Sequence, residues 1–271
     1  MAAPFVLKSS NTKESTFDRL IEQVGFNHMP NDDLLNESFV LHKAHTRGSA
    51  DHGWLKVNHT FSFANYLNPQ RMNFGVLRVL NDDTIAGGKG FGTHPHDNME
   101  IITYVRKGAI THQDNKGNKG RTTAGNVQVM SAGTGIFHSE YNMEDEETNI
   151  YQIWIKPAEK GLIPNWDAAE FPKMPVTNSL QLLVSGDGSA PLHINQDARI
   201  YAGRINKGDA LQHAIAGKAY LLVAEGNLLV NDLDAHKGDG VAINDEGNVT
   251  LKAETEAEVL VIEVPGLQDA R

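Results

Sequence analysis

Two short motifs of this sequence carry side chains that bind metal ions in proteins. His94-Pro95-His96 places two imidazoles two residues apart, and His138-Ser139-Glu140 repeats the spacing with an imidazole and a carboxylate. Side chains two residues apart on a β-strand point to the same face, so each motif can direct two donors to one point. Imidazole suits iron, copper, nickel and zinc, and a carboxylate favours harder ions. The two motifs therefore predict a single-metal site on neighbouring strands.

The residue types and their spacing do not decide which glutamate is the carboxylate ligand. Glu140 lies two residues after His138, but Glu100 has the same parity as His94 and His96 and could face the same side. An isolated His-x-His pair is usually incidental, whereas two such pairs, both beside glycine turns, are much harder to attribute to chance. The glycine-rich turn at 132–135 does not indicate a phosphate loop, because no strand–glycine–helix signature surrounds it.

Short strand-like segments with turn residues between them surround both motifs. They recur at roughly 8- to 12-residue spacing, which is typical of an all-β sandwich or barrel. In the first half they cover 39–41, 75–80, 100–105, 127–131 and 150–155, and in the second half 180–184, 200–205, 219–223, 227–230, 240–243 and 259–264. The sequence therefore predicts an all-β fold of two barrels in tandem.

Four prolines between residues 157 and 178 separate the two halves. Proline fixes φ and donates no backbone hydrogen bond, so this stretch indicates a linker or crossover rather than a central strand. We expect an N-terminal extension over 1–36 with one helical signal, a metal-binding barrel over 37–160, a linker over 161–178 and a second barrel over 179–271. The second half has no His-x-His pair, so its scattered histidines are expected to be surface or core residues: His193, His213 and His236.

Composition argues against several classes of function. The chain has no cysteine, which rules out disulfides, thiolate zinc sites and a cysteine nucleophile. Its formal net charge of −10 opposes direct nucleic-acid binding through a basic surface. No apolar run approaches the roughly 20 residues that span a bilayer, and the N-terminus lacks the regions of a secretory signal. We expect a soluble, cytoplasmic protein that does not bind membranes.

Residues 88–142 resemble the two motifs of the cupin superfamily. The first motif is matched by Gly88, His94, His96 and Glu100, and the second by Gly125, Gly133, His138 and Asn142. Gly108 arrives one residue late, Ser131 stands where proline is usual, and the turn before His138 is two residues longer. These departures are typical of the pirin family, to which the chain is similar over roughly 39–265, and most of all to bacterial pirin-like quercetin 2,3-dioxygenases.

The resemblance implies a bicupin, two tandem jelly-roll barrels with a metal in the first barrel only. It implies that His94, His96, His138 and Glu140 bind the metal, which favours Glu140 over Glu100 as the carboxylate ligand. The implied cofactor is one divalent metal ion, with Fe(II) first and Zn, Ni, Cu, Mn or Co as alternatives.

The resemblance also implies a dioxygenase that cleaves quercetin or a similar flavonol with O2, with Glu140 as the catalytic base. The substrate pocket is expected to include Phe91, Glu100, Met130, Phe137, His59 and His112, although each of these is also a reasonable core or surface residue. The alternatives are a non-enzymatic, redox-sensing regulator that acts through protein partners, a different cupin reaction at the same metal, and a structural zinc site. The last is disfavoured because closed structural zinc sites usually contain cysteine.

Overall fold

The computed structural model describes residues 38–244 and 247–267, and its regular elements in these ranges are β-strands and one 3₁₀ turn, η2 (Ala44–Thr46). This confirms the predicted all-β fold. The helical signal within 1–36 lies outside the described residues. No helix among the residues that the structure describes is long and apolar enough to cross a membrane.

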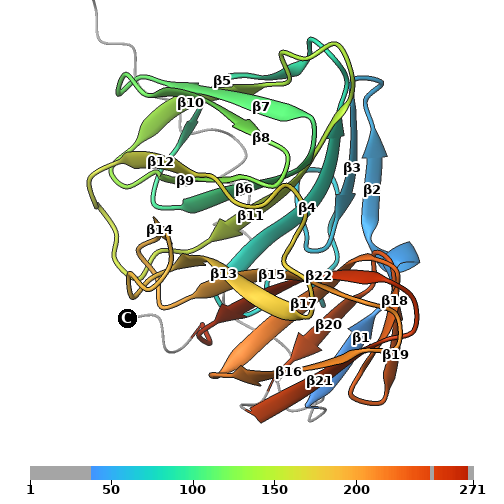
Figure 1. The fold of residues 1–271 in the computed structure, drawn as a ribbon. Helices are drawn as coiled ribbons and strands as arrows, with labels where there is room; N and C mark the ends of the chain where they lie inside the picture. The colour runs from blue at the N-terminus through green and yellow to red at the C-terminus, as the bar shows by residue number, and fades with distance from the viewer. Residues whose placement is uncertain (1–37, 245–246, 268–271) are drawn as a thin grey trace, which may run out of the picture. The chain divides into compact units, whose positions relative to one another are not determined.

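Two sheets form the first barrel, seen in Figure 1 as the strands coloured from blue (β2) through green to dark yellow (β12). The seven-stranded sheet has the order β12-β9-β6-β11-β4-β3-β2 and the four-stranded sheet β5-β10-β7-β8. The larger sheet comprises β2 (Gly48–Asp51), β3 (Leu55–His59), β4 (Leu77–Ile85), β6 (Glu100–Lys107), β9 (Val127–Ser131), β11 (Thr148–Ile155) and β12 (Asn165–Ala169). The smaller comprises β5 (Gly90–His96), β7 (Ala109–Asp114), β8 (Lys119–Thr123) and β10 (Ile136–Tyr141).

The second barrel repeats this arrangement. Its seven-stranded sheet has the order β1-β20-β17-β22-β15-β13-β14, and its four-stranded sheet β16-β21-β18-β19. The larger sheet comprises β1 (Phe39–His42), β13 (Ser179–Ser185), β14 (Leu192–His193), β15 (Arg199–Ile205), β17 (Lys218–Glu225), β20 (Gly240–Ile243) and β22 (Ala257–Val264). The smaller comprises β16 (Ala210–Ile215), β18 (Asn227–Val230), β19 (Leu233–His236) and β21 (Gly247–Ala253).

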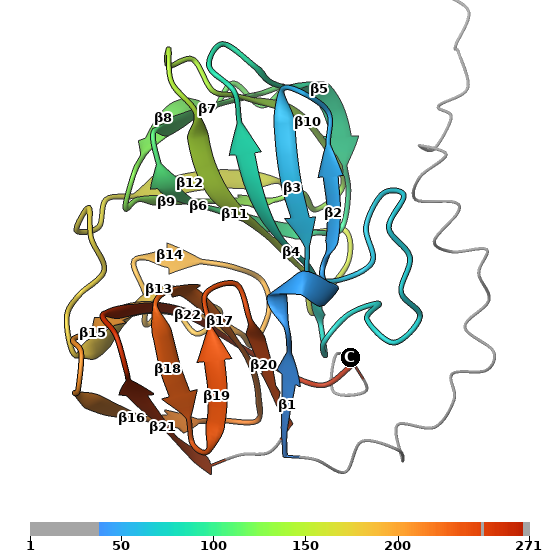
Figure 2. The same cartoon turned by 90° about the vertical axis from the view of Figure 1, so that its right-hand side faces the viewer.

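At two places the strand pairing does not follow the domain boundaries that were expected from the sequence. The strand β1, expected in the first barrel, pairs antiparallel with β20 and so extends the second barrel's sheet (Figure 2). The strand β12 lies inside the expected linker but pairs with β9 of the first barrel. Both are edge strands of their sheets, and pairing covers an edge that would otherwise expose its backbone groups. Prolines on either side of β12 are compatible with an edge position.

The two barrel interiors differ in chemistry. The second is filled by one apolar cluster that includes Leu221, Val241 and Leu251, all of them fully buried. The first has only small apolar clusters, and it also buries polar side chains such as Gln128, Glu140 and Gln152. Buried polar groups cost free energy unless they are paired, so they indicate a site rather than a stabilising core.

A single apolar cluster joins the two seven-stranded sheets. Its members include Leu80 and Ile102 from the first barrel and Tyr220 and Leu260 from the second. The strands β4, β6 and β11 are therefore buried on both faces, and most of their residues are buried along the whole strand.

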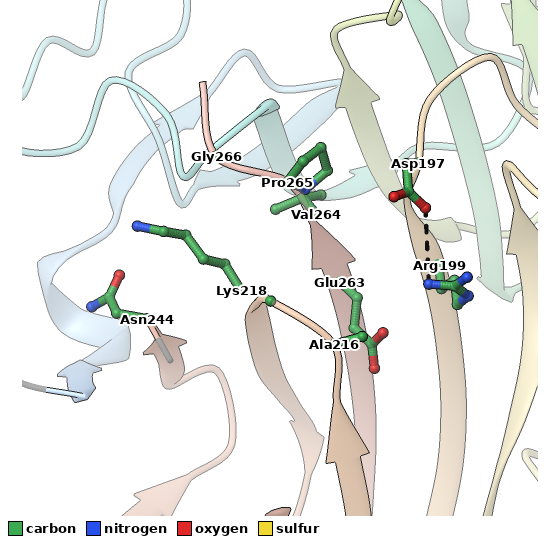
Figure 3. Close-up of a pocket in the computed structure, with 10 residues that line it drawn as sticks. Asp197, Arg199, Ala216, Lys218, Asn244, Glu263, Val264, Pro265 and Gly266 are labelled. Carbon is green, nitrogen blue, oxygen red and sulfur yellow. Dashed lines mark ion pairs between the residues drawn. The ribbon is translucent and has the colours of Figure 1, made fainter. Parts of the chain in front are cut away.

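A surface pocket of about 460 Å³ lies on the second barrel (Figure 3). Its lining mixes both charges, with Asp197 and Glu263 against Arg199 and Lys218. Glu263 is nearly buried and accepts a 2.7 Å contact from His213 Nε2. The pocket lining includes no residue of the two His motifs.

A buried ion pair crosses between the barrels and yields a stability prediction. Arg106 of β6 contacts Glu258 of β22, their side chains are 13% and 10% exposed, and Arg106 Nη1 also donates to Tyr151 Oη at 2.9 Å. Replacing Glu258 with methionine leaves the guanidinium buried without its counter-charge. We expect the free energy of unfolding, measured by urea denaturation, to fall by about 3–5 kcal/mol.

The exposed pair Arg204–Glu256 provides the matched control, because its carboxylate is 63% exposed. Glu256→Met should change the free energy of unfolding by less than about 1 kcal/mol. The double variant Arg106→Met with Glu258→Met should recover much of the loss, since a buried pair replaced by apolar side chains is often neutral. Equal effects of the two single variants would contradict the prediction.

Candidate metal centre

Strands β5 and β10 bring the two motifs together. In their antiparallel pairing His94 lies opposite His138, and Phe91 lies opposite Glu140. Between these pairs β10 advances by two residues and β5 by three, which is the count of a β-bulge. The extra residue allows both Phe91 and His94 to face inward, and their rings are 6.5 Å apart.

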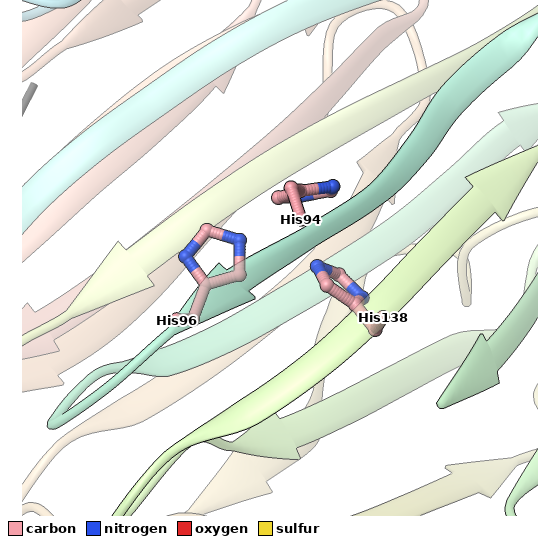
Figure 4. A group of neighbouring side chains, drawn as sticks. All are labelled: His94, His96 and His138. Atoms are coloured by element: carbon pink, nitrogen blue, oxygen red, sulfur yellow. The ribbon is translucent and has the colours of Figure 1, made fainter. Parts of the chain in front are cut away.

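The three histidines converge on one point (Figure 4). One ring nitrogen from each of His94, His96 and His138 lies within 4.8 Å of the other two. The ring centroids are 4.5 Å apart for His94 and His138, 4.8 Å for His94 and His96, and 5.0 Å for His96 and His138. Three imidazoles at this spacing can share one cation.

In His94 and His138 the hydrogen bonds of the ring leave Nε2 free to bind a metal ion. His94 Nδ1 lies 2.7 Å from the carbonyl oxygen of Gly92, so Nδ1 carries the proton and Nε2 keeps its lone pair. His138 Nε2 is buried and has no hydrogen-bond partner among the described residues. A buried polar atom without a partner is rare, and an ion that the structure does not include is one of its ordinary explanations. The donor set therefore fits a divalent cation.

Burial keeps two of the rings neutral. Loss of solvation, together with the neighbouring His138 and His94, lowers the pKa of His96 to about 2. Loss of solvation, with His94 and His112, lowers the pKa of His138 to about 3. Only neutral imidazole can donate a lone pair to a metal, so both rings are ready to do so at neutral pH.

Glu140 is held by hydrogen bonds rather than grouped with the histidines. Its Oε1 accepts from Gln128 Nε2 at 2.7 Å and from Thr103 Oγ1 at 3.0 Å, and its Oε2 accepts from Gln152 Nε2 at 2.9 Å. Among residues 38–244 and 247–267, the group whose donor atoms lie within 4.8 Å of one another contains three histidines and no carboxylate. The structure thus brings together three of the four expected ligands.

Sequence reasoning missed the three side chains that hold Glu140. Thr103, Gln128 and Gln152 each interrupt a buried strand that is otherwise largely apolar. A polar residue at a buried strand position is a signal of an internal partner, since a buried polar group needs a hydrogen bond.

Three of the residues expected in the substrate pocket lie inside the first barrel. Phe91 packs edge-on against Trp54 at 5.3 Å, and Met130 is buried in a cluster with Ile101 and Ile136. His112 is buried and contacts His138, with their Nδ1 atoms 3.4 Å apart.

His59 is linked to the histidines by a row of aromatic side chains. It packs against Phe63 at 5.4 Å, Phe63 packs against Trp154 at 5.3 Å, and Trp154 packs against His96 at 4.9 Å. Its Nδ1 lies 3.0 Å from Asn81 Oδ1.

Two other residues expected in the pocket lie elsewhere. Phe137 is 50% exposed, because its neighbour His138 takes the inward position on β10. Glu100 lies on the face of β6 opposite Thr103 and accepts hydrogen bonds from Ser131 Oγ at 2.6 Å and from the backbone N–H of Asn195 at 3.2 Å. Glu100 therefore joins the two barrels instead of lining the metal centre.

Comparison with known proteins agrees with this geometry. Residues 40–155 match the family described as Pirin, and residues 182–264 match the quercetinase C-terminal cupin domain. The chain is 50% identical over 221 residues to a pirin-like protein of Caulobacter vibrioides, covering 80% of this chain and 95% of that relative. It is 45% identical over 229 residues to the quercetin 2,3-dioxygenase of Escherichia coli, covering 83% and 98%.

A solved structure shows the same architecture. The bacterial pirin YhhW of Escherichia coli in complex with nickel(II) is 44% identical, with a TM-score of 0.79 over 84% of this chain and 99% of that one. The first half of the chain matches Pirin and the second half a cupin domain, and the two barrels are those of a bicupin. From its sequence matches and its fold, this chain belongs to the pirin family.

Proposed function

We propose that this protein is a metal-dependent dioxygenase that cleaves quercetin or a similar flavonol with O2. The observation that carries the proposal is the convergence of His94, His96 and His138 around the buried, unpartnered Nε2 of His138. The relative from Escherichia coli that carries the name quercetin 2,3-dioxygenase supports the choice of reaction.

In this proposal the three histidines and Glu140 hold one divalent cation, Fe(II) in the native protein. A cation held there would supply Lewis-acid chemistry, which lowers the pKa of a coordinated hydroxyl and stabilises the oxyanion. The reaction consumes one flavonol and one O2 and releases one carbon monoxide and one depside, so both oxygen atoms are retained in the products.

Glu140 is the base that takes the proton of the flavonol hydroxyl. Its carboxylate is 3% exposed, and Gln128, Gln152 and Thr103 hold it in position. A base must lie within hydrogen-bond reach of the proton that it removes, and a carboxylate held by three donors is placed with little freedom. Phe91, Met130 and Trp154 supply apolar surface inside the barrel for the aromatic rings of the substrate.

The test is metal content together with flavonol-dependent O2 uptake. We expect close to one metal ion per chain, quercetin-dependent uptake, and carbon monoxide and depside as products. Chelation should abolish the uptake, and reconstitution with Fe(II), Ni, Cu, Zn, Mn or Co in turn identifies the metals that restore it.

Bound metal without O2 uptake in any reconstituted form would overturn the dioxygenase proposal. It would favour the redox-sensing regulator that acts through protein partners.

The cysteine-free composition is compatible with action in the reducing cytoplasm, which we propose as the compartment.

A further inference from the structure

A chain of three buried side chains lies behind the metal centre. His112 Nε2 is 2.9 Å from Asp114 Oδ2, and His112 Nδ1 is 3.4 Å from His138 Nδ1. Asp114 and His112 come from β7, and β10, which carries His138, pairs directly with that strand. The side chains of His112 and Asp114 are 1% and 0% exposed, so water does not compete for these contacts.

With Asp114 ionised and His112 neutral, the hydrogen bonds of the three groups fix where each proton sits. An ionised carboxylate only accepts hydrogen bonds, so His112 Nε2 must donate to Asp114. A neutral His112 then has only a lone pair at Nδ1, and His138 must donate to it from its own Nδ1. The remaining nitrogen of His138 is Nε2, which therefore carries a lone pair, and this is the buried atom that has no partner among the described residues.

Asp114 is built to stay ionised. Its Oδ1 accepts from the backbone N–H groups of Lys116 at 2.9 Å and Asn118 at 3.0 Å, and its Oδ2 accepts from Asn118 Nδ2 at 2.9 Å. Burial by itself raises the pKa of Asp114, but the hydrogen bonds from His112, Asn118 and Lys116 outweigh it and hold the pKa below its usual value.

The ring of His112 is also fixed in orientation. Trp166 stacks on it with centroids 5.1 Å apart and planes 11° apart. Gly120 of β8 allows this stacking, because a Cβ at that position would come within 2.2 Å of the Trp166 ring. The indole therefore prevents the rotation that would take His112 away from His138.

We infer that Asp114 and His112 are positioning residues that hold His138 in the tautomer whose Nε2 is free to bind the metal. Through His112, the Asp114 carboxylate also makes the His138 ring a stronger electron-pair donor to the metal, as hydrogen-bonded partners of metal ligands do. The inference rests on His138 as a metal ligand and not on the dioxygenase reaction.

Ring nitrogen shifts in the NMR spectrum of the metal-free protein at neutral pH test the tautomer directly. In the wild type we expect His138 to be protonated at Nδ1 and unprotonated at Nε2. In Asp114→Asn the new amide oxygen can accept from the backbone N–H groups of Lys116 and Asn118. The new amide nitrogen then donates to His112 Nε2, provided that the side-chain amide of Asn118, which donates to this position in the wild type, turns its oxygen toward it. This reverses every hydrogen bond in the chain and places the proton of His138 on Nε2. The equivalent change in a Ser-His-Asp triad leaves the geometry intact and imposes the wrong tautomer.

The affinity for Ni(II) and Zn(II), measured by calorimetric titration of the metal-free protein, should fall about 10- to 100-fold in Asp114→Asn. Asp234→Asn is the matched control, because Asp234 and His236 form the same i, i+2 pair at 2.9 Å on the exposed surface of the second barrel. This control should leave both the His138 tautomer and the metal affinity unchanged.

His112→Phe is a second variant that keeps a ring for Trp166 to stack on but cannot accept from His138. It should weaken metal binding to a similar degree, with circular dichroism confirming the fold. Wild-type His138 protonated at Nε2, or an Asp114→Asn variant with wild-type tautomer and affinity, would overturn the inference. None of these readouts is catalytic. A failed dioxygenase assay therefore does not contradict the inference about the His138 tautomer, and failure of that inference does not contradict the dioxygenase proposal.

Discussion

The variant His94→Ala is expected to lose its metal ion and all flavonol-dependent O2 uptake. His94 donates its Nδ1 proton to Gly92, so its Nε2 is committed to the point where the three histidines meet. Loss of an outer hydrogen-bond partner costs about 10- to 100-fold in metal affinity, and loss of a ligand itself should cost more. Metal content by mass spectrometry should fall from about one per chain toward zero, and uptake should match that of the chelated wild type.

His236→Ala is the matched control for this experiment. His236 is also a strand histidine hydrogen-bonded through one ring nitrogen, but it is 51% exposed and lies in the second barrel. It should retain wild-type metal content and uptake. A His94→Ala protein that keeps a full complement of metal would show that His94 is not a ligand, and the metal centre proposed above would be wrong.

The convergence of the histidines could be predicted because it depends on local geometry. Residues i and i+2 of one strand share a face, and this property needs no knowledge of the rest of the chain. The pairing that places His94 opposite His138 then follows if their strands are neighbours, as they are in the structure. The bulge that turns Phe91 inward has no comparable local signal.

The parity argument failed for Glu100 for a physical reason. It assumed that Glu100 continues the strand of His94 and His96, but β5 ends at His96 and β6 begins at Glu100. Between them lies a turn in which Asn98 has a φ of 44°. At this turn the chain passes from the four-stranded sheet to the seven-stranded sheet, so parity counted across the turn says nothing about which face a side chain takes.

The expectation for Phe137 as a pocket wall differs from that for Glu100 because it concerns neighbours on one strand. An inward His138 requires its neighbours on the same strand to point outward, so the sequence already contained the evidence against Phe137 as a pocket wall. The environment of Glu140 could not be predicted in this way. Thr103, Gln128 and Gln152 come from β6, β9 and β11, and only the register of those strands brings them to one carboxylate.

The variant Glu140→Gln keeps the three converging histidines and an amide oxygen in place of the carboxylate, so it is expected to retain its metal. It should lose about 10²- to 10⁴-fold in turnover, which is the usual contribution of a positioned base. An amide cannot take a proton from the flavonol hydroxyl. Its NH2 would also face a donor, because all three side chains around Glu140 donate to it. Rotation of the Gln152 amide would present its oxygen to the new NH2, so we expect a loss of only about 1–3 kcal/mol in the free energy of unfolding.

Glu100→Gln is the control that distinguishes loss of the catalytic base from the general effect of replacing a buried carboxylate. Glu100 is also a buried carboxylate, 1% exposed and hydrogen-bonded by Ser131 and Asn195, but it lies on the other face of the sheet. This variant should lose stability to a similar degree and keep its turnover per bound metal. Full turnover in Glu140→Gln would exclude Glu140 as the base, whereas loss of the metal from that variant would show that its carboxylate is needed mainly as a ligand. A hydrogen-bonded carboxylate that leaves metal binding intact but is required for turnover is the outcome expected of a base.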